Sequence, residues 1–225
     1  MMYWLLFFLS IHTLTNAGVV KTNTPCEGIN ANFNLKTVIG SWHVVAVFPD
    51  KLFPDKDIVC YKVEISETDE ASLRWLVNKT LDGRPTTPLS DTIKGTVVRQ
   101  RYHTEHPFDL WSKSAKGING CFQQVVSLDL SNPRHVLVND VLSDISKTGD
   151  AITMMQLHLM DAADGSDPFL VQILWGRLIS AVIYRKTQGV TQEQLKPVYE
   201  FLSRVRGPQR LPKICENTLQ DILML

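Results

Sequence analysis

Two histidines, His103 and His106, are the residues whose type and spacing first suggest chemistry, because imidazole nitrogens bind transition metals. Their segment, His103-Thr-Glu-His106, lacks the His-Glu-x-x-His spacing that places two ligands on one helical turn. Two such histidines on a loop are usually solvated, so we expect no metal and no cofactor. The chain also lacks a Gly-x-Ser-x-Gly nucleophile elbow, and we expect that it is not an enzyme. A hydrolase with an unrecognised site is the less favoured alternative.

The four cysteines are the second chemical feature. In an oxidising compartment an even number predicts two disulfide bonds, which would leave no free thiol for catalysis. A four-cysteine zinc site is the alternative, but such sites use close pairs such as Cys-x-x-Cys. The two nearest cysteines here are 34 positions apart, so disulfides are favoured. The cysteines are Cys26, Cys60, Cys121 and Cys215.

Residues 1–17 predict that the protein enters the secretory pathway. Positions 1–14 contain no Lys, Arg, Asp or Glu, and Tyr3–Leu9 is almost entirely apolar. Thr15-Asn16-Ala17 then presents small residues to a signal peptidase, with cleavage expected before Gly18. The apolar run is shorter than the roughly 20 residues that cross a bilayer, so a signal peptide fits better than an anchor. We therefore expect a secreted, extracellular protein without stable membrane insertion.

The charge balance argues against polyanionic partners. The chain has 23 basic and 23 acidic residues, so there is no electrostatic reason to expect nucleic acid or an anionic membrane as a partner. Asn78-Lys79-Thr80 is a glycosylation sequon, and its use would place Asn78 on an outer surface.

Apolar residues alternate with polar ones from residue 40 onward, which is the pattern of antiparallel strands with one wet face. In the first strand Trp42, Val44, Ala46 and Phe48 alternate with their neighbours. The segment His103–Gly120 is harder to place, because its part 106–112 fits either a strand or an ordered loop. The predicted strands are 40–48, 61–66, 73–78, 93–102, 121–130, 134–141, 151–160 and 169–185.

One helix follows the strands, over residues 191–206. Thr191 and Gln194 form a capping box, and Gly207-Pro208 ends the helix. Pro197 should cost a backbone hydrogen bond and kink the first turns. The apolar face that should pack on the sheet comprises Leu195, Val198, Tyr199, Leu202 and Val205. Many antiparallel strands must close or stack to protect their edges, and composition and spacing leave a barrel and a sandwich both open.

The chain resembles the lipocalins, nearest to the insect and apolipoprotein D-like branch that includes insecticyanin. The resemblance rests on Gly40-Ser41-Trp42 in the first strand, on Arg185 at the end of the last strand, on the following helix and on the order of the cysteines. It implies an all-β fold, an eight-stranded up-and-down antiparallel β-barrel with one C-terminal flanking α-helix. In that family the Trp closes one end of the barrel and the Arg packs over it.

The resemblance also implies the organisation of residues 18–225 as a single domain. The barrel would cover about 38–186, the helix 191–206 and a disulfide-tethered tail 207–225. The implied disulfide pairs are Cys26–Cys121 and Cys60–Cys215.

As a function, the resemblance implies an extracellular lipocalin that binds and transports a small hydrophobic ligand, such as a lipid, pigment, retinoid or hormone. A cell-surface receptor or another protein is a further expected partner. The alternative is a secreted interaction protein of the inhibitor type, with a filled barrel and function in loops such as 51–57 or 105–120. The alternation also places Val44, Ala46, Ile65 and Ile93 inside. The candidate ligand contacts are Phe48, Tyr61, Val63, Leu73, Trp75, Val77, Val97 and Met154, with Tyr61 and Trp75 favoured as aromatic walls.

Overall fold

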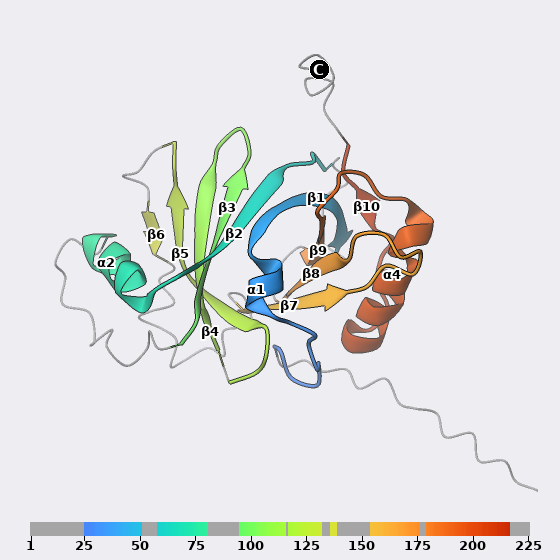
Figure 1. The fold of residues 1–225 in the computed structure, drawn as a ribbon, viewed down its shortest axis with the longest axis horizontal. Helices are drawn as coiled ribbons and strands as arrows, with labels where there is room; N and C mark the ends of the chain where they lie inside the picture. Colours follow the sequence, from blue (N-terminus) through green and yellow to red (C-terminus); the bar gives the residue numbers. More distant parts are fainter. Residues whose placement is uncertain are drawn as a thin grey trace, which may run out of the picture.

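Eight antiparallel strands close into a barrel in the computed structural model (Figure 1), and the predicted fold class is confirmed. Each strand pairs with the next, and the last pairs back with the first. The structure describes residues 25–50, 58–80, 95–115, 117–131, 136–138, 154–175 and 179–216. The barrel strands are β1 (Gly40–Pro49), β2 (Lys62–Thr68), β3 (Val97–His103), β4 (Phe108–Ser114), β5 (Cys121–Asp129), β7 (Met154–Met160), β8 (Phe169–Leu174) and β9 (Ile179–Arg185).

Two short strands are attached to this barrel. β6 (Val136–Val138) pairs with the second half of β5, and β10 (Lys213–Ile214) pairs with β1. The predicted signal peptide lies outside the described residues. In the described part of the chain, every helix is too short or too polar to cross a bilayer.

A β-bulge in β1 changes which of its side chains face the interior. β9 pairs Tyr184 with Val44 but Ile183 with Ala46, so β1 holds one extra residue at this point. An extra residue reverses the alternation beyond it. Val47 therefore joins the interior, whereas Ala46 and Phe48 face outward. The prediction that Ala46 and Phe48 point inward is wrong for this reason.

The segment predicted as a strand at 73–78 is instead part of a helix, α2 (Glu70–Thr80). Asp69 accepts a hydrogen bond from the backbone N–H of Ser72 at 2.6 Å, which satisfies one free donor of the first turn. Leu73 and Leu76, spaced as i and i+3, are buried against the outer face of β3 and β5. The alternation at 73–78 was therefore misleading, because the same residues also fit a helical period.

Tertiary packing decides the orientation of that helix. Trp75 is 63% exposed, so it lines no pocket. Val77 and Asn78 lie in α2, but their side chains are outside what the structure describes, so use of the sequon stays a prediction.

The C-terminal helix α4 (Gln192–Arg206) is confirmed, together with its capping box. The N–H of Gln194 donates to Thr191 Oγ1 at 3.3 Å, and the N–H of Thr191 donates to Gln194 Oε1 at 3.0 Å. The helix continues through Pro197 to Arg206. Its buried face packs on the outside of the barrel, on the side opposite α2 (Figure 1).

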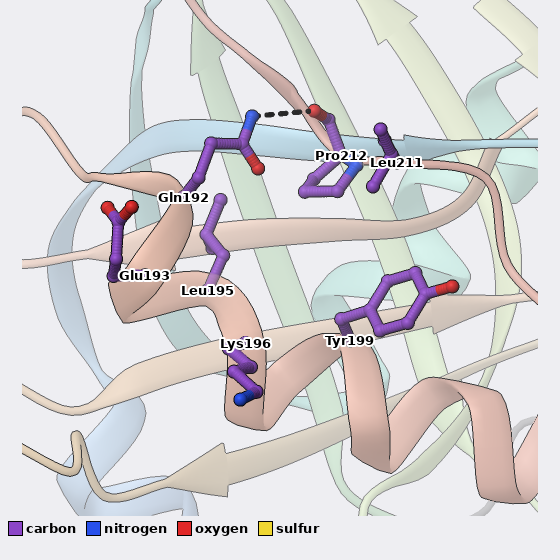
Figure 2. A pocket seen from close by; sticks show the side chains of 7 residues that line it. All are labelled: Gln192, Glu193, Leu195, Lys196, Tyr199, Leu211 and Pro212. Carbon is purple, nitrogen blue, oxygen red and sulfur yellow. Dashed lines mark hydrogen bonds between the residues drawn. The ribbon is translucent and has the colours of Figure 1, made fainter.

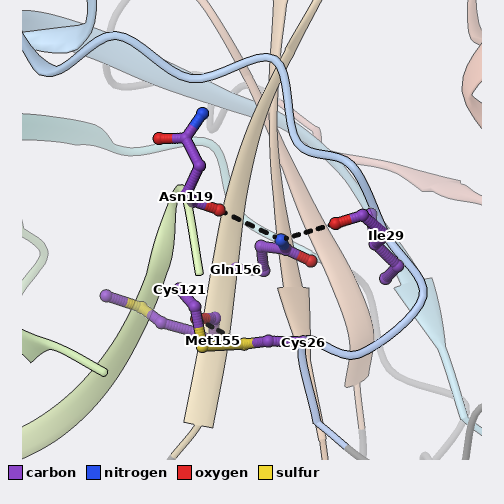
Figure 3. The surroundings of a disulfide bond; sticks show 6 residues. All are labelled: Cys26, Ile29, Asn119, Cys121, Met155 and Gln156. Atoms are coloured by element: carbon purple, nitrogen blue, oxygen red, sulfur yellow. Dashed lines mark hydrogen bonds between the residues drawn. A yellow bond between two sulfur atoms is a disulfide. The ribbon is translucent and has the colours of Figure 1, made fainter. Parts of the chain in front are cut away.

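Both predicted disulfide pairs are confirmed, Cys26–Cys121 and Cys60–Cys215. The first ties the segment before β1 to the start of β5 (Figure 3). Beside it, the side-chain amide of Gln156 donates to the carbonyl oxygens of Ile29 and Asn119 at 3.3 and 3.2 Å. Two disulfides indicate an oxidising environment.

Candidate functional site

One end of the barrel interior is closed by the segment before β1. Helix α1 (Leu35–Val38) lies there, and Trp42 Nε1 donates to the carbonyl oxygen of Val38 at 2.6 Å. The Trp42 side chain is 1% exposed. Gly40 has φ +118°, a conformation that a residue with a Cβ rarely adopts, so the glycine of the Gly-x-Trp motif is required by the backbone.

The cation over Trp42 is Lys186, whose Nζ lies 3.9 Å from the ring centroid. The expected pairing of Arg185 with Trp42 is wrong. β9 places Arg185 opposite His43, and adjacent residues of a strand face opposite sides. Arg185 therefore lies on the α4 side, over the ring of Phe169 at 5.2 Å, and donates to Ser166 Oγ at 2.8 Å.

The half of the interior next to Trp42 is filled with apolar side chains. These residues come from the strands β1, β2, β3, β7 and β8 and are at most 1% exposed. The residues are Val44, Val63, Ile65, Val98, Leu157 and Leu170.

A polar cluster of Gln100, Tyr102, Gln172 and Tyr184 lies within this interior. Gln172 Oε1 accepts from Gln100 Nε2 at 3.1 Å and from the Tyr184 hydroxyl at 2.5 Å. The hydroxyls of Tyr102 and Tyr184 are 3.3 Å apart. Because Tyr184 gives its one proton to Gln172, Tyr102 must donate to Tyr184. Gln172 Nε2 in turn donates to the sulfur of Met155 at 3.0 Å.

The phenols of Tyr61 and Tyr184 stay neutral over the physiological range. Burial, with the neighbouring tyrosines as a smaller cause, raises the pKa of Tyr184 well above its ordinary value, and burial also raises the pKa of Tyr61. Both side chains therefore offer hydroxyl groups and no charge.

The rings of Tyr61, Tyr102 and Phe108 form an aromatic wall at the end of the barrel where β3 turns into β4, and Tyr102 belongs to both the wall and the polar cluster. The rings of Tyr102 and Phe108 are stacked, with centroids 4.6 Å apart and planes at 5°. The Tyr61 ring lies 5.8 Å from Tyr102, tilted by 50°. Unlike the residues around Trp42, Tyr61 and Phe108 are partly exposed. This end of the interior is therefore the part that an external molecule can reach.

Two of the predicted ligand contacts, Phe48 and Met154, face outward under α4. Phe48 follows the bulge, and its ring lies 6.3 Å from that of Tyr199 on α4. Met155, the neighbour of Met154, pairs with Phe122 and faces the interior instead. The assignment of Phe48 and Met154 to a pocket is therefore wrong.

Two more predicted contacts, Val97 and Leu73, pack together on the outside under α2. Val98 is the residue of that strand that faces inward. Tyr61 and Val63 lie in the interior cluster, and their contact with a ligand stays a prediction.

The polar cluster was not predicted, although β3 carries a usable signal. Arg99 and Arg101 alternate with Val98, Gln100 and Tyr102. A charged residue on every second position marks the wet face, so the uncharged residues between must face inward.

Charged side chains lie outside the barrel wall. On the outer face, Arg99 Nε and Arg101 Nε lie 2.8 and 2.9 Å from the carboxylate oxygens of Asp109. Among the described residues, the buried charged side chains are Asp109 and Arg185, and both face away from the interior. The interior that the structure describes therefore holds no buried charge.

A second concave site lies on the surface, between α4 and the tail (Figure 2). It encloses about 290 Å³ and is lined by apolar parts of Leu195, Tyr199 and Leu211. Gln192 Nε2 bridges it by donating to the carbonyl oxygen of Pro212 at 3.4 Å. Leu211 is 76% exposed, so this groove is open to solvent along one side.

Of the two histidines that first suggested chemistry, His103 contacts a carboxylate. His103 Nε2 lies 3.3 Å from Glu64. Within the described ranges, no three His, Cys, Asp or Glu side chains come together as a potential metal site.

Because these phenols stay neutral in the folded protein, we expect its stability to fall at alkaline pH. The folded state keeps the protons of Tyr61 and Tyr184 above about pH 10, where the unfolded chain releases them. Stability should therefore be unaffected near neutrality and fall by up to about 1.4 kcal/mol per pH unit for each of these groups above pH 10. Urea unfolding at a series of pH values measures this, and Tyr184→Phe should flatten the dependence. Ordinary titration of every tyrosine near pH 10, seen by tyrosinate absorbance of the folded protein, would contradict it.

Comparison with known proteins adds no relative. No family model matches this chain, and no curated protein matches it significantly.

Proposed function

We propose that this protein is a secreted lipocalin that binds and carries a small hydrophobic ligand at the end of the barrel opposite α1. The observation that carries the proposal is the aromatic wall of Tyr61, Tyr102 and Phe108 beside buried polar groups, in which Tyr61 and Phe108 are partly exposed. Apolar walls with a few placed polar groups are typical of sites for small molecules. The closed barrel and the Gly-x-Trp motif at its covered end support the family assignment.

The ligand in this proposal is small. The half of the barrel around Trp42 is filled by side chains, so a bound molecule occupies the half nearer the aromatic wall. An eight-stranded barrel has just enough interior for side chains or for one small ligand, so a ligand that shares this interior with side chains must be small.

A filled-barrel interaction protein is the second candidate, and the near-zero exposure of the residues around Trp42 favours it. Its binding surface would lie in loops. Of the two loops expected from the sequence, 51–57 is outside the described residues, whereas most of 105–120 forms β4 and its flanking turns.

Uptake of a neutral fluorescent probe, N-phenyl-naphthylamine, distinguishes the two. The carrier should bind it saturably, and Phe108→Ala should weaken binding about tenfold or more, because burying a Phe side chain contributes about 1.5–3 kcal/mol. Trp75→Ala is the matched control, since it removes an aromatic ring from the exposed face of α2 and should leave uptake unchanged. Circular dichroism confirms that each variant is folded.

Absence of saturable uptake by the native protein would overturn the carrier proposal and favour the filled barrel. An equal loss in Trp75→Ala would show that the probe binds outside the barrel. Native mass spectrometry of the purified protein provides a second readout, because a carrier should retain a small molecule.

A further inference from the structure

Two buried polar atoms in the barrel interior have no hydrogen-bond partner among the residues that the structure describes. They are the amide oxygen of Gln100 and the hydroxyl of Ser112. Gln100 is 0% exposed and Ser112 is 1% exposed. Folded proteins rarely leave such atoms unsatisfied, because the cost of removing them from water is not recovered.

Both atoms face the same space from adjacent strands. Ser112 pairs with Val98, which faces the interior, and Gln100 lies two positions further along the same strand. The other end of the Gln100 amide is held in place, since its Nε2 donates to Gln172. The amide oxygen is therefore a fixed acceptor.

A residue beside this acceptor is in contact with solvent. Leu110 is the residue directly opposite Gln100 on β4, and its side chain is partly exposed although it belongs to the interior cluster. Tyr102, the next inward residue of β3, is stacked on Phe108. A ligand lying along this pair would place its inner end near Gln100.

The two unpartnered atoms determine which chemical group of a ligand can lie at its inner end. An amide oxygen accepts hydrogen bonds only, so its partner must carry an O–H or N–H group. A carboxylate only accepts, and it would also need a cation. The buried cation of the described residues, Arg185, lies on the outer face of the barrel under α4.

We infer that the ligand is uncharged and has an alcohol or amide group that donates a hydrogen bond to the Gln100 amide oxygen, with Ser112 as a second partner. This inference rests on the proposed function and specifies the ligand class. It predicts that the protein discriminates against fatty acids and other apolar anions in favour of neutral molecules with the same apolar body.

A pair of competitors that differ only in the head group tests this inference. Dodecanol and dodecanoate are each titrated against bound N-phenyl-naphthylamine. Dodecanol should displace the probe at concentrations at least about tenfold lower than dodecanoate. Gln100→Leu should abolish most of this preference, because it replaces the acceptor by an apolar group of similar size. The preference is the ratio of the two displacement concentrations, so it is independent of how tightly the variant holds the probe.

Gln123→Leu is the matched control. Gln123 pairs with Lys113 on the outer side of the wall, so the same substitution there should leave the preference intact. Equal displacement by the two competitors, a preference for dodecanoate, failure of both to displace bound probe, or an unchanged preference in Gln100→Leu would overturn the inference while the carrier function stands. Failure of the native protein to bind the probe at all would instead remove the proposed function, and the inference with it.

Discussion

Replacing Trp42 by alanine is expected to lower the free energy of unfolding by about 3–5 kcal/mol, the range found for large aromatic side chains in cores. The ring is 1% exposed, its Nε1 donates to the carbonyl oxygen of Val38, and Lys186 covers one ring face. The substitution would leave a cavity at the closed end of the barrel and a buried carbonyl without its donor. Neither can be repaired locally, because the surrounding residues are fully packed.

Urea unfolding followed by circular dichroism measures this loss, and Trp75→Ala is again the matched control. Trp75 is 63% exposed, and its removal should change stability by less than about 1 kcal/mol. Similar effects of the two substitutions would mean that Trp42 does not close the barrel.

Replacing Cys26 and Cys121 together by alanine should destabilise the protein by about 2–5 kcal/mol. The bond joins residues 95 positions apart, so its loss gives the unfolded chain much additional freedom. In the folded state, the segment before β1 would keep its apolar contacts, such as that of Phe33 with Phe122, and its hydrogen bonds to the barrel. Those bonds include Leu159 N–H to the carbonyl oxygen of Asn32 and the N–H of Asn32 to His158 Nδ1.

Hydrogen exchange locates the structural part of this effect. The amides of Asn32 and Leu159 should lose protection in the Cys26/Cys121 variant. The control is the corresponding Cys60/Cys215 variant. It should instead expose the backbone amides of residues 60 and 216, whose hydrogen bonds join the segment before β2 to the tail. The same exchange pattern in both variants would contradict these separate roles.

The neutral interior connects the fold to the proposed function. Gln100 and Gln172, which are hydrogen-bonded, lie 72 positions apart in the chain. Tyr102 and Tyr184, whose hydroxyls are in contact, lie 82 positions apart. Closure of the barrel brings these strands together, so the polar cluster exists only in the folded protein. In the carrier that we propose, these uncharged groups would distinguish among ligands by hydrogen bonding.

Predictions made from neighbouring residues were confirmed where a single local interaction determines the structure. The capping box at Thr191 and Gln194 defines the start of α4, because its two hydrogen bonds need only residues three positions apart. Alternation correctly identified the inward face at the start of β1 and in β2, where no bulge interrupts the pairing. The disulfide pairs followed the lipocalin resemblance, since spacing alone cannot choose among pairings.

Predictions failed where a single residue changes the register or where two periods compete. Because of the extra residue in β1, Phe48 lies on the outer face against α4 and not in the interior. No pattern among neighbouring residues predicts a bulge. Leu73 and Trp75 fit the alternation of a strand, whereas Leu73 and Leu76 fit one face of a helix. The contact of Leu73 and Leu76 with the outer wall decided for the helix.

The sequence by itself determined the class of this protein: one-sided strands, a capped helix and an even set of cysteines are properties of neighbouring residues. Only the tertiary structure decided what the barrel contains. Which side chains face inward depends on register across the closed sheet, and a shift of one residue reverses it. For that reason Arg185 lies outside with Phe169, whereas two glutamines and two tyrosines meet inside.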